Sequence, residues 1–127
     1  MKRAALLCLL LAGAARAEVV VCDVDYGGTT RRVVAAPTAD PLQVRPVEFE
    51  SWFLFRVVFR PAPVDLAGIK LYTYGRGPDG PQLIHQASHP YPPPAAADGS
   101  FTGVQAVYEP RLNAELQYRC ALADDGK

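Results

Sequence analysis

Apolar and polar side chains alternate in steps of two along much of this chain. The clearest case is Ser51–Arg60, where one face carries Phe53, Phe55, Val57 and Phe59. A period of two places successive side chains on opposite sides of a β-strand. We therefore expect this segment to be the central strand of the fold, with its phenylalanines buried in the core.

The same alternation recurs at intervals, and no long segment repeats its apolar residues with the period of a helix. The expected strands are Glu18–Asp25, Thr29–Ala36, Ser51–Arg60, Gly68–Tyr74, Gln82–Ser88, Phe101–Glu109 and Glu115–Leu122, with a short edge strand at Leu42–Val44 as an eighth candidate. Turns rich in glycine and proline separate several of them. The pattern predicts an all-β, single-domain, antiparallel β-sandwich of seven to eight strands, with a small β-barrel as the alternative.

Two connections stand out by composition. Gly75–Pro81 (GRGPDGP) predicts a long loop between two strands of a hairpin, because glycine accepts a positive φ and proline presets a bend. His89–Ser100 (HPYPPPAAADGS) has too many prolines for a central strand, since proline has no N–H to donate to a ladder.

The N-terminal residues 1–17 have the features of a cleaved signal peptide. Lys2 and Arg3 precede a short apolar stretch, and Ala15-Arg16-Ala17 fits the small-x-small pattern of a cleavage site. We expect cleavage after Ala17, a sandwich domain at 18–123 and a flexible tail at 124–127. No later apolar run is long enough to span a membrane, so we predict a periplasmic or secreted protein.

Loss of the signal peptide would remove Cys8 and leave two cysteines. Cys22 and Cys120 would then form a single disulfide, the usual state of paired cysteines in an exported chain. The bridge would join the first strand to the last. The alternative, a redox or metal-binding thiol, lacks the closely spaced cysteines typical of such sites.

A partial resemblance supports the sandwich class. Tyr118-Arg119-Cys120 resembles the Tyr-x-Cys pattern of the immunoglobulin-type sandwich, in which the tyrosine lies two residues before the second cysteine. Trp52, on the strongest strand, invites the same comparison, but it follows Cys22 by 30 residues, farther than the tryptophan of that family follows its first cysteine. The resemblance implies an immunoglobulin-like fold and no particular function.

Charge narrows the range of partners. The chain has 13 basic and 13 acidic side chains, and removal of residues 1–17 would leave ten basic against 13 acidic, a net charge of −3. Nucleic-acid binders are usually basic. We therefore expect no nucleic-acid partner.

The only histidines, His85 and His89, are the candidate metal ligands. On a strand, residues four apart share a face but lie about 13 Å apart at about 3.3 Å per residue, which is too far for one metal unless the chain bends. The serines lack the glycine pattern of a nucleophile elbow. We expect no enzyme activity and no cofactor, and we keep a metal-binding module built on His85 and His89 as the alternative function.

Outward-facing aromatic residues are the most suggestive feature. The alternation places Trp52, Tyr72 and Tyr74 opposite the apolar faces of their strands, Arg56 shares the outer face, and Tyr91 lies in the proline-rich segment. Aromatic residues mixed with arginine are enriched at interfaces. We expect a non-catalytic binding or accessory protein that meets a protein or a glycan through this face; simple packing under long charged side chains is the competing interpretation.

Overall fold

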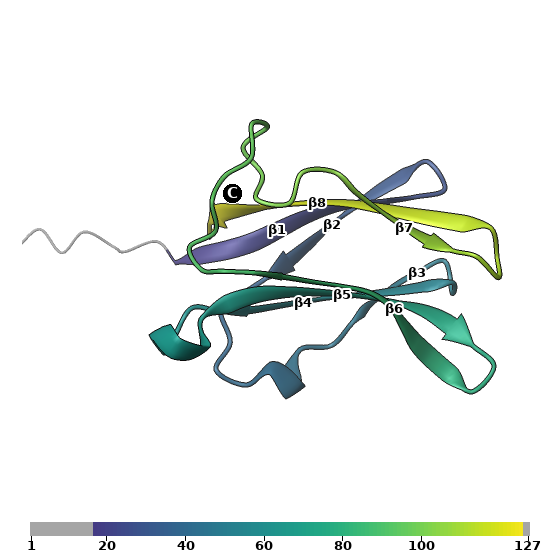
Figure 1. Ribbon diagram of the computed structural model, residues 1–127, viewed down its shortest axis with the longest axis horizontal. Coiled ribbons are helices and arrows are strands. Elements are labelled where there is room, and N and C mark those ends of the chain that lie inside the picture. The colour runs from purple at the N-terminus through teal and green to yellow at the C-terminus, as the bar shows by residue number, and fades with distance from the viewer. Residues whose placement is uncertain (1–16, 126–127) are drawn as a thin grey trace, which may run out of the picture.

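A computed structural model describes residues 17–125, and it is an all-β sandwich of two four-stranded sheets (Figure 1). The predicted signal peptide lies outside the described residues except for Ala17, as do residues 126–127 of the predicted tail. The strands are β1 (Glu18–Tyr26), β2 (Thr29–Ala35), β3 (Val47–Phe49), β4 (Phe53–Arg60), β5 (Gly68–Gly77), β6 (Gly80–His89), β7 (Gln105–Glu109) and β8 (Ala114–Asp124).

The two sheets are separate layers. The first has the strand order β2-β1-β8-β7 and the second β3-β4-β5-β6, and every neighbouring pair is antiparallel. Within residues 17–125 no strand ladder joins the edge of one sheet to the edge of the other. The sandwich prediction is therefore confirmed, and the barrel alternative is excluded.

The core lies between the sheets and is built on the predicted face of β4. Phe53, Phe55 and Phe59 are almost completely buried. The ring of Tyr118, on β8 of the opposite sheet, lies 5.2 Å from the ring of Phe55, and Tyr26 packs edge-on against Phe53 at the same distance. Burial of such side chains stabilises the fold by about 1.5–3 kcal/mol each.

The disulfide between Cys22 and Cys120 is present and joins the first strand to the last, as predicted. The two residues face each other directly in the β1–β8 ladder, and both are fully buried. In the immunoglobulin domain the bridge connects the two sheets. Here it lies within one sheet, so the two layers are held together by side-chain packing and by an isolated parallel bridge between Pro37 and Phe59, where the Thr38 N–H donates to the Phe59 carbonyl at 2.9 Å.

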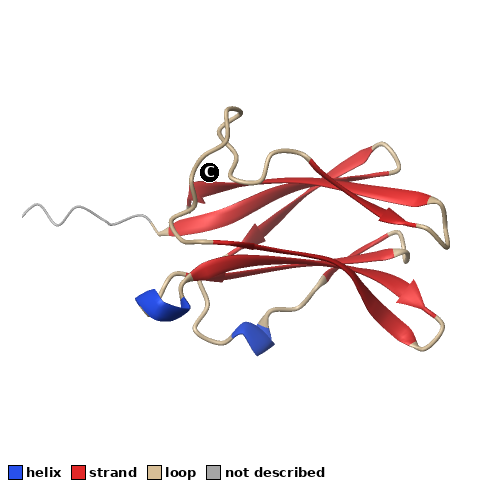
Figure 2. Ribbon diagram, in the orientation of Figure 1, coloured by secondary structure: helices blue, strands red, loops and turns tan. Residues whose placement is uncertain are grey.

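The predicted edge strand at Leu42–Val44 is wrong. Pro41–Gln43 form a 3-10 helix, η1, because Pro41 suits the first turn and the Asp40 carboxylate accepts a hydrogen bond from the Leu42 N–H (3.1 Å). The edge strand of the second sheet is instead β3. A second 3-10 helix, η2 (Val64–Leu66), precedes β5. Figure 2 shows both helices on the outer side of the second sheet, away from the first.

The hairpin of β5 and β6 is tighter than expected. The strands continue to Gly77 and restart at Gly80, so only Pro78 and Asp79 form the loop and the prediction of a long loop is wrong. Gly80 has a φ of 115°, which only glycine adopts readily. The long paired arms give β5 and β6 ten residues each, which enlarges the outer face of the second sheet.

The strand predicted at Phe101–Glu109 is confirmed only in its second half. Before β7 the chain crosses β8 as a loop, in which Phe101 donates its N–H to the Cys120 carbonyl and Thr102 Oγ1 accepts from the Cys120 N–H, both at 2.9 Å. The buried side chains of β7 are Val107 and Glu109. Val104, Ala106 and Tyr108 face solvent.

Candidate binding site

The outer face of the second sheet is partly covered by residues 41–46. Arg56 holds this segment in place: its Nε donates to the Val44 carbonyl at 2.9 Å, and its Nη2 donates to the Pro41 carbonyl. The guanidinium also lies over the Tyr72 ring, 5.2 Å from the ring centre. This cover explains why Val58, whose side chain points outward from β4, is only 5% exposed.

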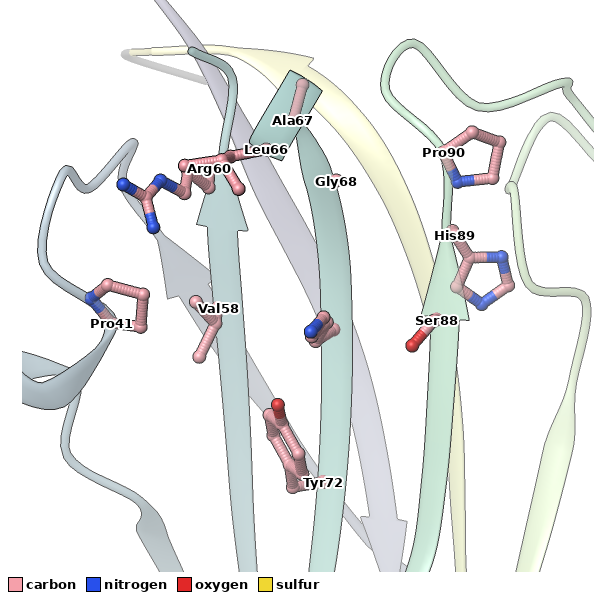
Figure 3. A pocket seen from close by; sticks show the side chains of 11 residues that line it. Pro41, Val58, Arg60, Leu66, Ala67, Gly68, Tyr72, Ser88, His89 and Pro90 are labelled. Atoms are coloured by element: carbon pink, nitrogen blue, oxygen red, sulfur yellow. The ribbon is translucent and has the colours of Figure 1, made fainter. Parts of the chain in front are cut away.

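Two hollows lie on this face, and we call them together the trough. The first, of about 400 Å³, lies between η1 and η2. Val58 and Tyr72 form its floor, and Figure 3 shows Pro41 on one side and Ser88 on the other. The second, of about 420 Å³, lies between residues 42–46 and Pro81, over Leu54 and Tyr74. Both volumes are in the range of sites for small ligands.

The two tyrosines predicted to form a binding face lie at the middle of the trough. Tyr72 and Tyr74 point outward from β5, and their ring planes are 21° apart with centres separated by 6.4 Å. Both are half-buried. One ring borders the first hollow and the other borders the second, so a ligand that filled both hollows would contact both rings.

The trough is lined by cations and by no carboxylate. Arg60 and Lys70 line the first hollow, and Arg45 and Arg56 line the second. Within residues 17–125 none of these four forms an ion pair. Arg60 Nε is buried, and no hydrogen-bond partner for it lies within the described residues. By contrast, Arg32, Arg76, Arg111 and Arg119 each pair with a carboxylate.

Two of the predicted aromatic residues lie elsewhere. Trp52 precedes β4 in the turn after β3, where Glu50 and Ser51 have positive φ, and it is 46% exposed. The ring of Tyr91 packs edge-on against Phe59 in the core at 5.0 Å, and its hydroxyl donates to the Glu18 carboxylate. That hydrogen bond raises the pKa of Tyr91. Tyr91 therefore closes one end of the sandwich.

The two histidines share the inner face of β6 but do not form a common site. The His85 ring lies 5.9 Å from the ring of Tyr118, and the His89 ring lies 5.1 Å from that of Phe101. Burial lowers the pKa of His89. Between residues 17 and 125, no group of three or more His, Cys, Asp or Glu side chains is placed to hold a metal ion.

One polar cluster lies inside the sandwich. Thr73 and His85 are opposite each other in the β5–β6 ladder, and Thr73 is also opposite Phe55 of β4. The Tyr118 ring contacts both ends of this row, Phe55 and His85. Thr73 Oγ1, His85 Nδ1 and the Tyr118 hydroxyl are all buried without a hydrogen-bond partner in the described chain. Burial raises the pKa of Tyr118 to about 12, so this hydroxyl stays neutral.

A buried carboxylate lies at the opposite end of the core from Tyr91. The Glu109 side chain is 1% exposed, and both of its oxygens accept hydrogen bonds from the Arg111 guanidinium, at 2.9 and 3.0 Å. These bonds hold the pKa of Glu109 below its usual value. Gly75 leaves the space that this carboxylate fills. The pair is a structural element and lines neither hollow of the trough.

The sequence indicated the floor of the trough but not its wall. Tyr72, Tyr74 and Arg56 follow from alternation along their strands. Arg45 and the rest of the segment 41–46 do not, because their position depends on hydrogen bonds to a residue far along the chain. The Asp40-Pro41 pair, typical of the start of a helical turn, was the available signal.

Comparisons of the chain with protein-family models, with curated proteins and with solved structures found no match. Among the helices of the described part of the chain, none is long and apolar enough to cross a membrane.

Proposed function

We propose that this protein is an exported, non-catalytic binding module and that its ligand occupies the trough on the second sheet. The disulfide supports export to the periplasm or beyond, because disulfides persist in oxidising compartments. The start of β1 at Glu18, directly after the predicted cleavage site, is consistent with removal of residues 1–17.

One observation carries the proposal: two hollows of ligand size lie on the same face of β4 and β5, beside the segment 41–46 that Arg56 holds in place. A surface fixed before binding avoids part of the entropy cost of ordering the site. Aromatic rings over a rigid sheet also supply contact area with few rotatable bonds. The trough therefore has the features of a binding surface.

The test uses the full chain expressed for export and recovered from outside the cytoplasm. The mass of the recovered protein checks cleavage after Ala17. Nuclear magnetic resonance titrations with a panel of soluble glycans and peptides should then shift amide resonances of β4 and β5. Shifts confined to the first sheet, or no shifts with any member of the panel, would overturn the proposal.

A double substitution, Tyr72→Ala with Tyr74→Ala, should weaken the binding found in these titrations without lowering the melting temperature by more than a few degrees. Tyr108→Ala is the matched control, since Tyr108 is an exposed tyrosine on the first sheet. If the double variant unfolds, the single variants Tyr72→Ala and Tyr74→Ala replace it. Binding as tight as that of the wild type in a folded alanine variant of either kind would show that the rings serve packing, and the proposal would fail.

A further inference from the structure

The cations of this protein are distributed unevenly. Nine lysines and arginines lie in residues 17–125, and four of them are neutralised by carboxylates. Of the remaining five, only Arg31 lies outside the trough, and it is held against the Phe49 ring. The other four line the two hollows. Positive charge without a partner is thus concentrated on one face, although acidic side chains outnumber basic ones by 13 to nine within residues 17–125.

Each hollow combines the same two kinds of group. The first has Arg60 and Lys70 above the apolar surface of Val58 and Tyr72. Figure 3 shows the Arg60 guanidinium at the side of the hollow away from Ser88. The second is lined by Arg45 and Arg56 together with Leu54 and Tyr74, and the Arg56 guanidinium also reaches over the ring of Tyr72. Because each hollow combines cationic side chains with a tyrosine ring, the two hollows together fit a ligand made of repeating units, each with an anionic group and a ring.

The position of these groups on a sheet face argues against a peptide ligand. An extended peptide usually binds a sheet at its edge, where free backbone N–H and C=O groups complete the ladder. On the face of β4 and β5 the backbone groups are already used in ladders with neighbouring strands. The face instead offers the charged side chains of Arg45, Arg60 and Lys70, none of which forms an ion pair within residues 17–125. Such donors suit carboxylates and hydroxyls carried by the ligand itself.

We infer that the trough binds an acidic polysaccharide, with anionic groups of successive sugars at the Arg60–Lys70 and Arg45–Arg56 pairs and sugar rings against Tyr72 and Tyr74. This inference rests on the proposed function and specifies the ligand class of the same site. Attraction between the cations and the polyanion makes the affinity depend on salt, because ions screen exposed charges.

The experiment is a calorimetric titration of the exported protein with polygalacturonate and with alginate, two soluble polyuronates. Methyl-esterified polygalacturonate is the matched neutral ligand, and poly-L-glutamate is the matched acidic peptide. We expect the polyuronates to bind, the affinity to fall on going to about 0.15 M salt, and the ester and the peptide to bind at least about tenfold more weakly.

Substitutions locate the binding. Lys70→Gln removes one exposed charge and should weaken polyuronate binding about threefold, whereas Lys70→Arg should retain it. Arg60→Gln combined with Lys70→Gln should weaken it about tenfold or more. Arg32→Gln, which removes one charge from the first sheet, should leave it unchanged. Melting temperatures verify that each variant is folded.

Several results would overturn the inference. Equal binding of the methyl ester would assign a neutral glycan, and equal binding of poly-L-glutamate would assign an acidic protein. The same loss in Arg32→Gln as in Lys70→Gln would indicate unspecific charge attraction. Failure of both polyuronates to bind would also reject it. If other ligands still shift the resonances of β4 and β5, the proposed function survives any of these results.

Discussion

At the scale of single residues, Gly75 shows how closely the core of this protein is packed. A Cβ atom built on Gly75 would lie 2.1 Å from Glu109 Oε2, far inside van der Waals contact. Gly75→Ala must therefore displace a buried carboxylate and its bonds to Arg111. We expect a loss of about 1–3 kcal/mol in the free energy of unfolding, measured by chemical denaturation.

The control for Gly75→Ala is the same substitution in a Glu109→Ala background. Without the carboxylate the added methyl group has space, so its cost should fall, and the two substitutions should not be additive. An equal cost in both backgrounds would show that the carboxylate is not the obstacle.

Asp98 links one loop to β8 through hydrogen bonds that favour its ionised form. Its carboxylate accepts hydrogen bonds from Ser100 Oγ (2.6 Å) and from Arg119 Nε (2.8 Å), and these bonds lower its pKa from the usual 3.8 to about 2. Because the folded pKa lies below the unfolded one, unfolding takes up a proton between these two values. The contribution of Asp98 to stability is therefore complete above pH 4 and is lost as the pH falls toward 2.

We expect Asp98→Asn to flatten the decline of stability over that acidic range, as followed by urea denaturation at a series of pH values. Asp65→Asn, on the exposed η2, is the control and should leave the slope as it is in the wild type. An unchanged slope in Asp98→Asn would assign the acid sensitivity to other groups, of which Glu109 is the first to test, since its pKa is also lowered.

The alternation of apolar and polar residues predicted the buried side chains better than it predicted which aromatic side chains share the outward face. Phe53, Phe55 and Phe59 are buried because alternation places all three on one face of β4, and this strongly apolar face packs against the first sheet. Trp52 and Tyr91 were predicted to belong to the outward aromatic face, but they lie outside the trough for different reasons. Trp52 belongs to a turn with positive φ, and Tyr91 is drawn into the core by Phe59. Neither effect is visible in the residues nearby in sequence.

At the scale of elements, η1 and the segment after it depend on Arg56. We expect Arg56→Gln to lower the free energy of unfolding by about 1–2 kcal/mol through lost hydrogen bonds to two carbonyls. The Gln43 and Val44 amides, which donate to Asp40 and Pro41 over 3.2 and 3.3 Å, should exchange with deuterium faster.

Arg45→Gln tests whether this effect is specific, because Arg45 belongs to the same segment but makes no hydrogen bond in the described residues. In Arg45→Gln the Gln43 and Val44 amides should exchange with deuterium at the same rates as in the wild type. Uniformly faster exchange in Arg56→Gln, including amides in the middle of β4, would mean global destabilisation in place of local detachment.

The elements that sequence reasoning missed are the short ones. β3 has three residues, too few to show an alternation, and it is a strand because Val47–Phe49 pair with the start of β4. Leu42–Val44 had an extended appearance, but Pro41 and the Asp40 cap favour a helical turn. The long strands were predicted because their pattern persists over many residues. The wall of the trough was not, because it consists of these short pieces.

At the scale of the whole molecule, the disulfide closes 98 residues of chain into a loop. We expect Cys22→Ala with Cys120→Ala to lower the free energy of unfolding by about 2–5 kcal/mol. The β-type circular-dichroism spectrum should persist without denaturant, since the ladder between β1 and β8 remains. Chemical denaturation with and without a reductant measures the loss.

The reductant serves as the internal control. It should lower the stability of the wild type to that of the double variant and leave the variant as it is. Equal stabilities of the oxidised wild type and the variant would show that the bridge contributes nothing beyond the hydrogen bonds around it.

The pairing of the first strand with the last also decides how this protein can be joined to others. Glu18 lies opposite Asp124, and the Asp125 N–H donates to the Ala17 carbonyl at 2.7 Å, so both termini of the described chain leave from one end of the first sheet. A fusion partner or an anchoring tag at either terminus would stand on the layer opposite the trough. The protein is thus suited to immobilisation through its ends, with the layer that carries the trough turned toward the solution.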